Sequence, residues 1–306
     1  MKVRRLLEYV KWIEGVRFPL LAGLVYRLTT RLDNFLIKRE KIPANPLNTE
    51  IRDKKIIVSL TSFPARIEYV HLAIKSLILQ TYKPDRIILW LAESQFPDKQ
   101  LPQQLTDLQQ FGLEIKWCED MKSHKKYVEP IKQQKNDELV ITYDDDIIYS
   151  PLSIERLIKT HITHPNCIIC ERAQSIQYSD RGVINPHKWT PLSDVGVHSP
   201  SFSLNPSLGG GCLFPYNALN EEATDWNFIK TFALYDDDVW IMFMAALNAT
   251  PQIKTRKYHR IFSTVTNSQE KQLAHINIHS NLADETFFKL SSTYTIAYQR
   301  ITGKAK

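Results

Sequence analysis

The sequence predicts an α/β protein with a mostly parallel central sheet and helices on both of its faces. Short apolar runs rich in β-branched residues, such as Lys55–Ser62 and Arg86–Ala92, are typical of strands that are buried on both faces. Segments with a helical spacing of apolar residues lie between these runs, and alternating strands and helices imply parallel pairing. At 306 residues, of which 43% are hydrophobic, the chain is long enough to bury a substantial core.

The first elements follow a loop rich in proline and asparagine at Pro43–Asp53. Lys55–Ser62 (KIIVSLTS) is the first predicted strand, and Phe63–Arg66 is a turn. Ile67–Gln80 follows as a helix because its apolar residues recur at helical spacing. Arg86–Ala92 (RIILWLA) is the second strand.

The second half of the predicted sheet continues this alternation. Leu101–Phe111 is a predicted helix, Leu113–Cys118 the third strand, Tyr127–Lys135 a helix and Leu139–Tyr143 the fourth strand. In such sheets ligands bind beyond the carboxyl ends of the strands. The polar segments at those ends, which we expect to converge on one edge of the sheet, are Ser62–Arg66, Glu93, Asp120–Lys126 and Asp144–Asp146.

Three consecutive aspartates, Asp144–Asp146, end the fourth strand. Two carboxylates about 4 Å apart repel by roughly 4 kcal/mol at an effective dielectric of 20, so a cation, an Arg or Lys partner or open water must offset the repulsion. Mg²⁺ and Mn²⁺ take carboxylate oxygens and complete their shells with substrate phosphates. A solvated acidic turn is the alternative, but the apolar Ile147–Tyr149 follows at once, which favours a metal site.

The net charge of +6 belongs to the N-terminal arm. Of the 39 Lys/Arg and 33 Asp/Glu, ten and four lie in residues 1–42, which leaves 29 of each sign in the remaining body. A neutral body gives little support for nucleic-acid binding. The arm has the pattern of one or two basic amphipathic helices, which would either lie on an anionic inner leaflet through residues 1–40 or pack on the core.

The sequence shows no signal peptide and no spanning segment. The apolar patch Phe18–Tyr26 is interrupted by Pro19 and Gly23 and is far shorter than the about 20 residues that a bilayer requires. Four cysteines are too few for a disulfide scaffold, and the apolar filling of Cys167-Ile-Ile-Cys170 favours a buried strand with reduced thiols over a zinc site. A cytoplasmic location fits these features.

No Gly-x-Gly-x-x-Gly and no P-loop lysine follow the first strand, which argues against dinucleotide dehydrogenases and P-loop phosphotransferases. A fourth strand that ends in Asp-x-Asp within such a fold resembles the GT-A glycosyltransferases. Leu208–Pro215 (LGGGCLFP) is similar to the acceptor-side glycine segment of inverting members, and Asp236–Trp240 (DDDVW) to their acidic pair at a helix start. The stretches SLTSFPARI, KKY and DDDIIY resemble a group of bacterial surface-polysaccharide glycosyltransferases.

The resemblance implies a nucleotide-sugar donor and a Mn²⁺ or Mg²⁺ cofactor. Asp146 would be the main metal ligand, Asp144 would contact the ribose or the metal, and Asp145 occupies a normally variable position beside them. The metal would bridge the two donor phosphates and neutralise the departing diphosphate. A histidine completes the metal shell in some members, and the candidates, with His279 preferred, are His259, His275 and His279.

The resemblance also implies a catalytic base. Attack by an acceptor hydroxyl needs a carboxylate that takes its proton, and Asp238 matches that position, with Asp237 second. Capping of the helix N-terminus is the alternative role for these acids, but a cap needs only one of them.

The remaining candidates follow from the same resemblance. Thr61 and Glu93 lie where the family contacts the base and ribose, and Gly209–Gly211 would let the backbone approach the sugars or would simply form a turn. The basic candidates for the donor are Arg66, Lys125 and Lys126, although most lysines are solvated surface charges. Aromatic residues that could stack on a base or a sugar, or else belong to the core, are Phe63, Tyr82, Trp189, Trp226 and Trp240.

The predicted function is metal-dependent transfer of a hexose from a nucleotide-diphosphate sugar, UDP by analogy, to a glycan or lipid-linked acceptor in surface-polysaccharide synthesis. The acidic pair favours inversion. Residues 51–306 would form the GT-A-like catalytic domain and residues 1–50 the basic helical arm. Two alternatives stay open: a sugar-nucleotide nucleotidyltransferase, whose glycine-rich loop is missing after the first strand, and a non-catalytic carbohydrate- or metal-binding module.

Overall fold

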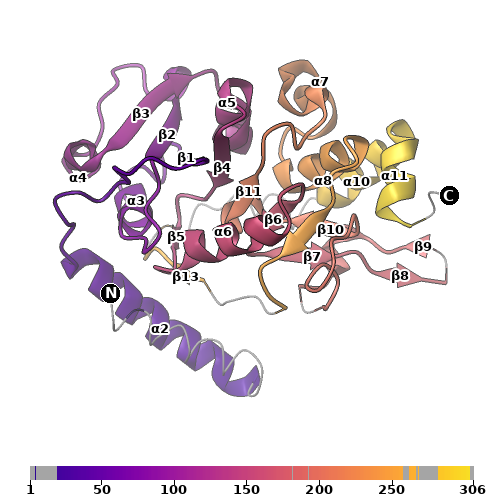
Figure 1. Cartoon of the computed structure of the whole chain (residues 1–306), viewed down its shortest axis with the longest axis horizontal. Coiled ribbons are helices and arrows are strands. Elements are labelled where there is room, and N and C mark those ends of the chain that lie inside the picture. The colour runs from indigo at the N-terminus through magenta and orange to yellow at the C-terminus, as the bar shows by residue number, and fades with distance from the viewer. Residues whose placement is uncertain are drawn as a thin grey trace.

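The computed structural model of the chain describes residues 4, 19–180, 182–191, 193–257, 262–266, 268 and 282–303. Its centre is a seven-stranded sheet with the strand order β12-β6-β11-β4-β1-β2-β3 (Figure 1). Within this sheet β11 runs antiparallel to both of its neighbours, and the other neighbouring pairs are parallel. The predicted α/β class with a mostly parallel sheet is therefore confirmed.

The four strands predicted from the first half of the chain are present to within one residue at each end. β1 lies between β2 and β4, with Ile57 opposite both Arg86 and Val140, and its apolar run is buried. The strands of the central sheet are β1 (Lys55–Thr61), β2 (Arg86–Ala92), β3 (Leu113–Cys118), β4 (Glu138–Thr142), β6 (Ile168–Cys170), β11 (Cys212–Phe214) and β12 (Gln252–Lys254).

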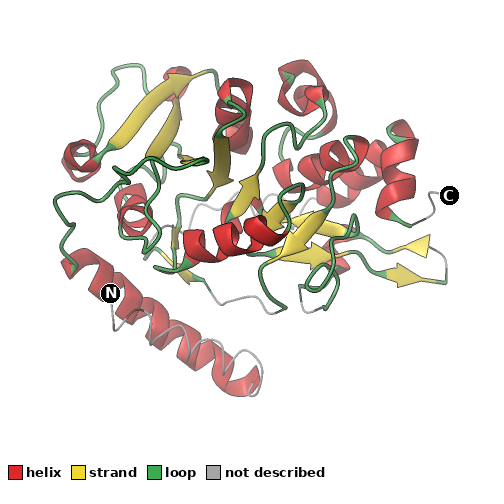
Figure 2. Ribbon diagram, viewed as in Figure 1, coloured by secondary structure: helices red, strands yellow, loops and turns green. Residues whose placement is uncertain are grey.

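Helices cover both faces of this sheet (Figure 2). Tyr127 and Trp240 belong to the apolar core on one face, whereas Ile74 and Leu157 belong to the core on the other. The first core takes side chains from α5 (Lys125–Gln133), α7 (Trp226–Phe232), α8 (Asp237–Leu247), α10 (Leu282–Thr293) and α11 (Thr295–Ile301). The second takes them from α3 (Val70–Ile78), α4 (Gln103–Thr106) and α6 (Ser153–Thr163).

Three predicted helices differ in extent from the observed ones, and the one expected over residues 127–135 lies two residues earlier, as α5. The helix expected over residues 67–80 begins at Val70, because residues 66–69 form turns. The helix expected over residues 101–111 divides into the short α4 and a 3-10 helix over Asp107–Phe111, which ends at Gly112 with φ +92°. Glycine tolerates this left-handed conformation, and it stops the helix directly before β3.

Residues 19–39 of the N-terminal arm form one helix, α2 (Pro19–Arg39), which continues through Gly23, and residues 40–50 form the loop that leads to β1. It lies at the edge of the molecule (Figure 1) and packs against α3, β5 (Ile147–Ile148) and β13 (Ser263–Thr264). Among the described residues, no helix combines the length and apolar character needed to cross a bilayer. Residues 5–18 lie outside the described part.

Three small two-stranded sheets complete the described part of the fold. β13 pairs with β5, and β5 is the strand that directly follows the aspartate triplet of residues 144–146. β10 (Leu204–Pro206) pairs with β7 (Ala173–Ser175), and β8 (Tyr178–Ser179) pairs with β9 (Gly182–Val183). Cys170 lies in the predicted buried strand, opposite Cys212 of β11 with their Sγ atoms 3.9 Å apart, and all four cysteines are free thiols.

Candidate functional site

The carboxyl end of β4 and the amino end of β11 lie at the same edge of the sheet. Because β11 is antiparallel, with Cys212 opposite Thr142, Gly209 just before β11 reaches the aspartates just after β4. The Tyr149 hydroxyl fixes this approach, since it donates to the Gly209 carbonyl at 2.6 Å and accepts from the Asp144 backbone N–H at 2.7 Å. The glycine segment and the first acidic triplet are thus held side by side.

Glycine is needed in this segment for steric reasons. A Cβ on Gly209 would lie 1.6 Å from Oδ2 of Asp144, and a Cβ on Gly210 would lie 2.7 Å from Cβ of Arg172. Gly211 has a φ of +100°, which side chains of L-residues rarely tolerate. Gly209 therefore admits the Asp144 carboxylate against the backbone, Gly210 makes room for Arg172, and Gly211 supplies the left-handed turn before β11.

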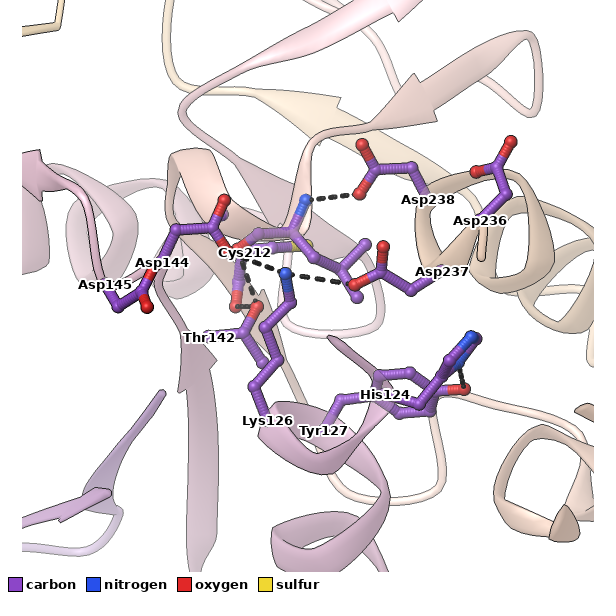
Figure 3. Close-up of polar contacts among 12 residues, drawn as sticks. His124, Lys126, Tyr127, Thr142, Asp144, Asp145, Cys212, Asp236, Asp237 and Asp238 are labelled. Atoms are coloured by element: carbon purple, nitrogen blue, oxygen red, sulfur yellow. Dashed lines mark hydrogen bonds and ion pairs between the residues drawn. The ribbon is translucent and has the colours of Figure 1, made fainter. Parts of the chain in front are cut away.

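A buried lysine joins the two acidic runs of the sequence. The Lys126 ammonium donates to Oδ1 of Asp144 at 2.7 Å and lies 3.0 Å from Oδ2 of Asp237, with the two carboxylates approaching it from opposite sides (Figure 3). Its side chain is 4% exposed. Burial would lower the pKa of Lys126, but the charges of Asp144 and Asp237 outweigh this effect and raise the pKa, so the ammonium stays charged.

The three aspartates at the start of α8 have different partners. Asp236 is the N-cap, and its Oδ1 accepts from the Val239 backbone N–H at 3.0 Å. Asp238 accepts from the backbone N–H of Leu208, the residue before the glycines, at 2.9 Å. Capping is therefore supplied by Asp236, and Asp237 and Asp238 both face the edge where the first triplet lies (Figure 3).

The neighbouring carboxylates at this helix start have pKa values shifted in opposite directions. Burial raises the pKa of Asp238 well above its usual value, and the adjacent Asp237 charge raises it further. Burial would also raise the pKa of Asp237, but the Lys126 ammonium outweighs it and lowers the pKa. Divergent pKa values in adjacent acids are the usual basis for dividing proton transfer from charge stabilisation. Asp238 is thus the better proton acceptor of the two.

Asp236 should make the stability of the fold depend on pH. Burial, ahead of the Asp237 charge, raises its pKa from 3.8 to about 7. The folded protein then binds more protons than the unfolded chain between these values, so this group makes the free energy of unfolding fall as the pH rises, by on the order of 3 kcal/mol. We expect Asp236→Asn, which keeps a good cap, to gain stability relative to the wild type between pH 4 and pH 8 in urea titrations.

The matched control is Asp225→Asn, at the exposed N-cap of α7. It exchanges the same side chains at a helix cap without the burial. A difference between Asp236→Asn and the wild type that stays constant with pH would contradict this prediction.

The middle and last aspartates of the first triplet are held by Arg66. Oδ1 of Asp145 accepts from the Arg66 guanidinium at 2.7 Å, and Oδ2 accepts from the Ser62 hydroxyl at 2.6 Å. The same guanidinium lies 3.2 Å from Oδ2 of Asp146. Burial raises the pKa of Asp145, although Arg66 opposes the shift. Because both oxygens of Asp145 are engaged by protein donors, this residue orients Arg66 beside Asp146.

A divalent ion can be held here only if the phosphates of a bound donor and water complete its coordination shell. Within the described part of the chain, no three His, Cys, Asp or Glu side chains form a group that could hold a metal. Mg²⁺ and Mn²⁺ need only one or two carboxylates when phosphates and water complete the shell. The 39% exposed Asp144 and the 13% exposed Asp146 fit that requirement, provided that Arg66 releases or shares Asp146. The histidine candidates His259, His275 and His279 lie outside the described residues.

The other predicted donor residues lie near neighbouring strand ends. The Thr61 hydroxyl donates to the Trp90 carbonyl at 2.8 Å and ties the end of β1 to β2. Glu93 is 61% exposed on its side chain and pairs with Lys99 at 3.0 Å. Lys125 is buried and lies 3.2 Å from Asp120, and burial lowers its pKa. The structure thus places Lys126 and Arg66 on the acidic triplet, whereas Thr61, Glu93 and Lys125 make their described contacts elsewhere.

Two of the five aromatic candidates, Trp189 and Trp240, have structural roles. Trp240 is fully buried, and its indole N–H donates to the Ala223 carbonyl at 3.1 Å. Trp189 is buried too and donates to the Ile184 carbonyl at 2.9 Å. Phe63 lies under the Arg66 guanidinium at 5.5 Å from its ring centre, so it remains near the site.

Two residues that shape the site are absent from the sequence-based set. Tyr149 spans Asp144 and Gly209, and Ser62 holds Asp145. Ser62 lies in the segment Ser62–Arg66, which was expected at this edge of the sheet, so its position in the sequence could have indicated a role in the site. Tyr149 follows Asp144 by five residues in an apolar run, and its spacing gives no indication that its hydroxyl turns back to the triplet.

No protein-family model and no curated protein matches the sequence. Among solved structures, the chain is similar to the mannosyltransferase PcManGT from Pyrobaculum calidifontis in complex with GDP-Man and Mn²⁺, at 11% identity and a TM-score of 0.46, over 96% of this chain and 81% of that one. It is also similar to 4-diphosphocytidyl-2C-methyl-D-erythritol synthase from Anaerococcus prevotii, at 15% identity and a TM-score of 0.41, over 75% of this chain and 100% of that one. The 2-C-methyl-D-erythritol 4-phosphate cytidylyltransferase of Francisella tularensis follows at 12% identity and a TM-score of 0.40, over 74% and 99% of the two chains. These scores are too low to assign a substrate or a reaction to this chain.

Proposed function

We propose that this protein is a metal-dependent glycosyltransferase that moves a hexose from a nucleotide-diphosphate sugar to a hydroxyl of a glycan or lipid-linked acceptor, with inversion at the anomeric carbon. UDP is the default nucleotide, and surface-polysaccharide synthesis is the default pathway, both by resemblance. In this proposal residues 51–306 form the catalytic domain.

One observation carries the proposal. Lys126 holds Asp144, from the triplet after β4, and Asp237, from the triplet at α8, in one charge cluster. The glycine segment borders this cluster through Gly209, which abuts Asp144. The three motifs that the resemblance identified separately along the chain therefore meet at one edge of the sheet, where parallel α/β folds bind their ligands.

The chemistry assigned to these residues begins at Asp238. Its carboxylate takes the proton of the acceptor hydroxyl as that oxygen bonds to the anomeric carbon, while the bond from this carbon to the donor phosphate breaks. The glycine segment at 209–211 is assigned to the sugar side of the site, where Gly209 lets the Asp144 carboxylate lie against the backbone. Lys126 keeps Asp237 ionised next to Asp238, and this negative charge favours protonation of the base.

Asp146 and Asp144 would hold the divalent ion, which when bound offsets negative charge on the leaving diphosphate. Arg66 and Lys126 lie beside these carboxylates and can add positive charge near the phosphates. Thr61, Glu93 and Lys125 are proposed for the nucleotide end of the donor, further along the same edge of the sheet.

The decisive experiment measures nucleotide release from a panel of UDP- and GDP-sugars with Mn²⁺, and compares the wild type with Asp146→Asn. We expect the substitution to lower metal-stimulated release at least about 100-fold and to abolish Mn²⁺-dependent nucleotide binding, because a neutral amide is a poor ligand for a hard cation. Asp98→Asn, at an exposed position, is the matched control and should behave as the wild type.

Full turnover by a folded Asp146→Asn variant would refute the metal assignment. Pyrophosphate release from a nucleoside triphosphate and a sugar phosphate would identify a nucleotidyltransferase instead. Ion binding without turnover of any donor would point to the non-catalytic module.

A further inference from the structure

Helix α2 turns Asp33 and Asn34 towards the body of the protein. Asn34 donates to the Thr264 carbonyl at 2.9 Å and accepts from the Thr266 backbone N–H at 3.0 Å. Asp33 accepts from the Ser263 hydroxyl at 2.6 Å. Both Asn34 and Asp33 are buried, so these directional bonds fix the rotation of α2 about its axis.

The opposite face of α2 is an exposed apolar stripe. Its members recur at intervals of three and four residues, which places them on one side of a helix. Packing on the core, the alternative role for the arm, occurs through the other face of α2, where Ile37 is fully buried, and it leaves this stripe uncovered. The stripe consists of Leu24, Leu28, Leu32 and Phe35, which are 56%, 54%, 39% and 49% exposed.

Positive charge borders this apolar stripe. Arg27, Arg31, Lys38 and Arg39 are all exposed, and Arg39 lies over the Phe35 ring at 4.0 Å from its centre. The single acid within α2 is Asp33, which faces the body. The outward face of α2 is therefore apolar along its middle and cationic along its margins.

We propose that this face of α2 lies in the headgroup layer of an anionic lipid bilayer. Leucine and phenylalanine side chains would enter the acyl boundary, and the arginine and lysine side chains would pair with lipid phosphates. A second copy of the chain is a poorer occupant, because pairing the same face would oppose one set of four cations to another. The inference does not depend on the enzymatic assignment.

The test is co-sedimentation of the full chain with vesicles of phosphatidylcholine, alone or mixed with phosphatidylglycerol, at low and high salt. We expect binding to the anionic vesicles that weakens with salt. Replacing the four stripe residues by glutamine should lower partition at least about tenfold. Replacing the four cations by glutamine should have a similar effect. Glutamine keeps a high helix propensity, so both variants should fold.

The matched control replaces four exposed apolar residues elsewhere, again three aliphatic side chains and one phenylalanine, by glutamine: Ile51, Ile162, Ile296 and Phe288. It should bind vesicles as the wild type does.

Failure of the wild type to sediment, equal binding to neutral vesicles, or unchanged partition of the stripe variant would overturn the proposal. A stripe variant that instead dissociates a wild-type dimer would assign this face to a second copy. Donor hydrolysis without vesicles, measured on the same preparations, separates loss of docking from loss of enzymatic function.

Discussion

Asp238→Asn is expected to lower the rate of sugar transfer by about 10²–10⁴-fold, the usual contribution of a positioned general base. The amide oxygen can still accept from the Leu208 backbone N–H, as the carboxylate does at 2.9 Å, so the fold should persist. Donor binding should also persist, because this residue is assigned to the acceptor proton and not to the diphosphate. Single-turnover kinetics and calorimetric titration of donor with Mn²⁺ separate the two effects.

The pH profile gives a second, independent measurement of the same role. Burial raises the pKa of Asp238, and the base must be deprotonated to act, so transfer by the wild type should accelerate as the pH rises. This limb of the profile should vanish in Asp238→Asn. Asp236→Asn is the matched control, because Asp236 caps α8 and should leave the limb in place. A full rate in Asp238→Asn, or donor binding lost with the fold, would reject Asp238 as the base.

Local sequence pattern was sufficient for β1 to β4 and β6 of the central sheet and for the places of the acidic runs, whereas the short strands β11 and β12 were not predicted. The strands β1, β2 and β4 are nearly continuous apolar runs, since both of their faces are covered by helices, and such runs are visible without any tertiary information. The edge strand β3 instead alternates apolar and polar residues and is mostly half-buried. Asp236 was a good candidate for a helix start because three acids preceded an apolar segment, and α8 begins there.

Two features depend on tertiary contacts and could not be predicted in this way. A lysine usually lies in solvent, and nothing local indicates that Lys126 reaches Asp144, 18 residues on, and Asp237, 111 residues on. The second such feature is the orientation of α2. An amphipathic pattern normally predicts that the apolar side of a helix is buried, which is not the case here. In α2 the side chains of Asp33 and Asn34 find partners around β13, and Leu24, Leu28 and Leu32 face outward.

Lys126→Met is expected to lower the free energy of unfolding by about 3 kcal/mol at neutral pH, because it leaves a buried carboxylate without its cation. Most of the loss should come from Asp237, whose side chain is 14% exposed, since the 39% exposed Asp144 can regain water. The Lys126 charge lowers the pKa of Asp237 in the fold, so the stability it gives is present at neutral pH and disappears as the pH falls below about 4. Urea unfolding at neutral and acidic pH measures both quantities.

The double variant Lys126→Met/Asp237→Asn distinguishes charge from packing. Removing the stranded carboxylate should restore most of the stability, because a neutral pair has no unpaired charge to bury. Turnover should stay at least about tenfold low, since Asp144 and the start of α8 are no longer joined. Lys132→Met, at an exposed position of the same helix, should change neither property. If the double variant is no more stable than Lys126→Met, the ammonium does not stabilise the site through Asp237, and the two acidic runs must be held together by the backbone contacts of Gly209 and Leu208 instead.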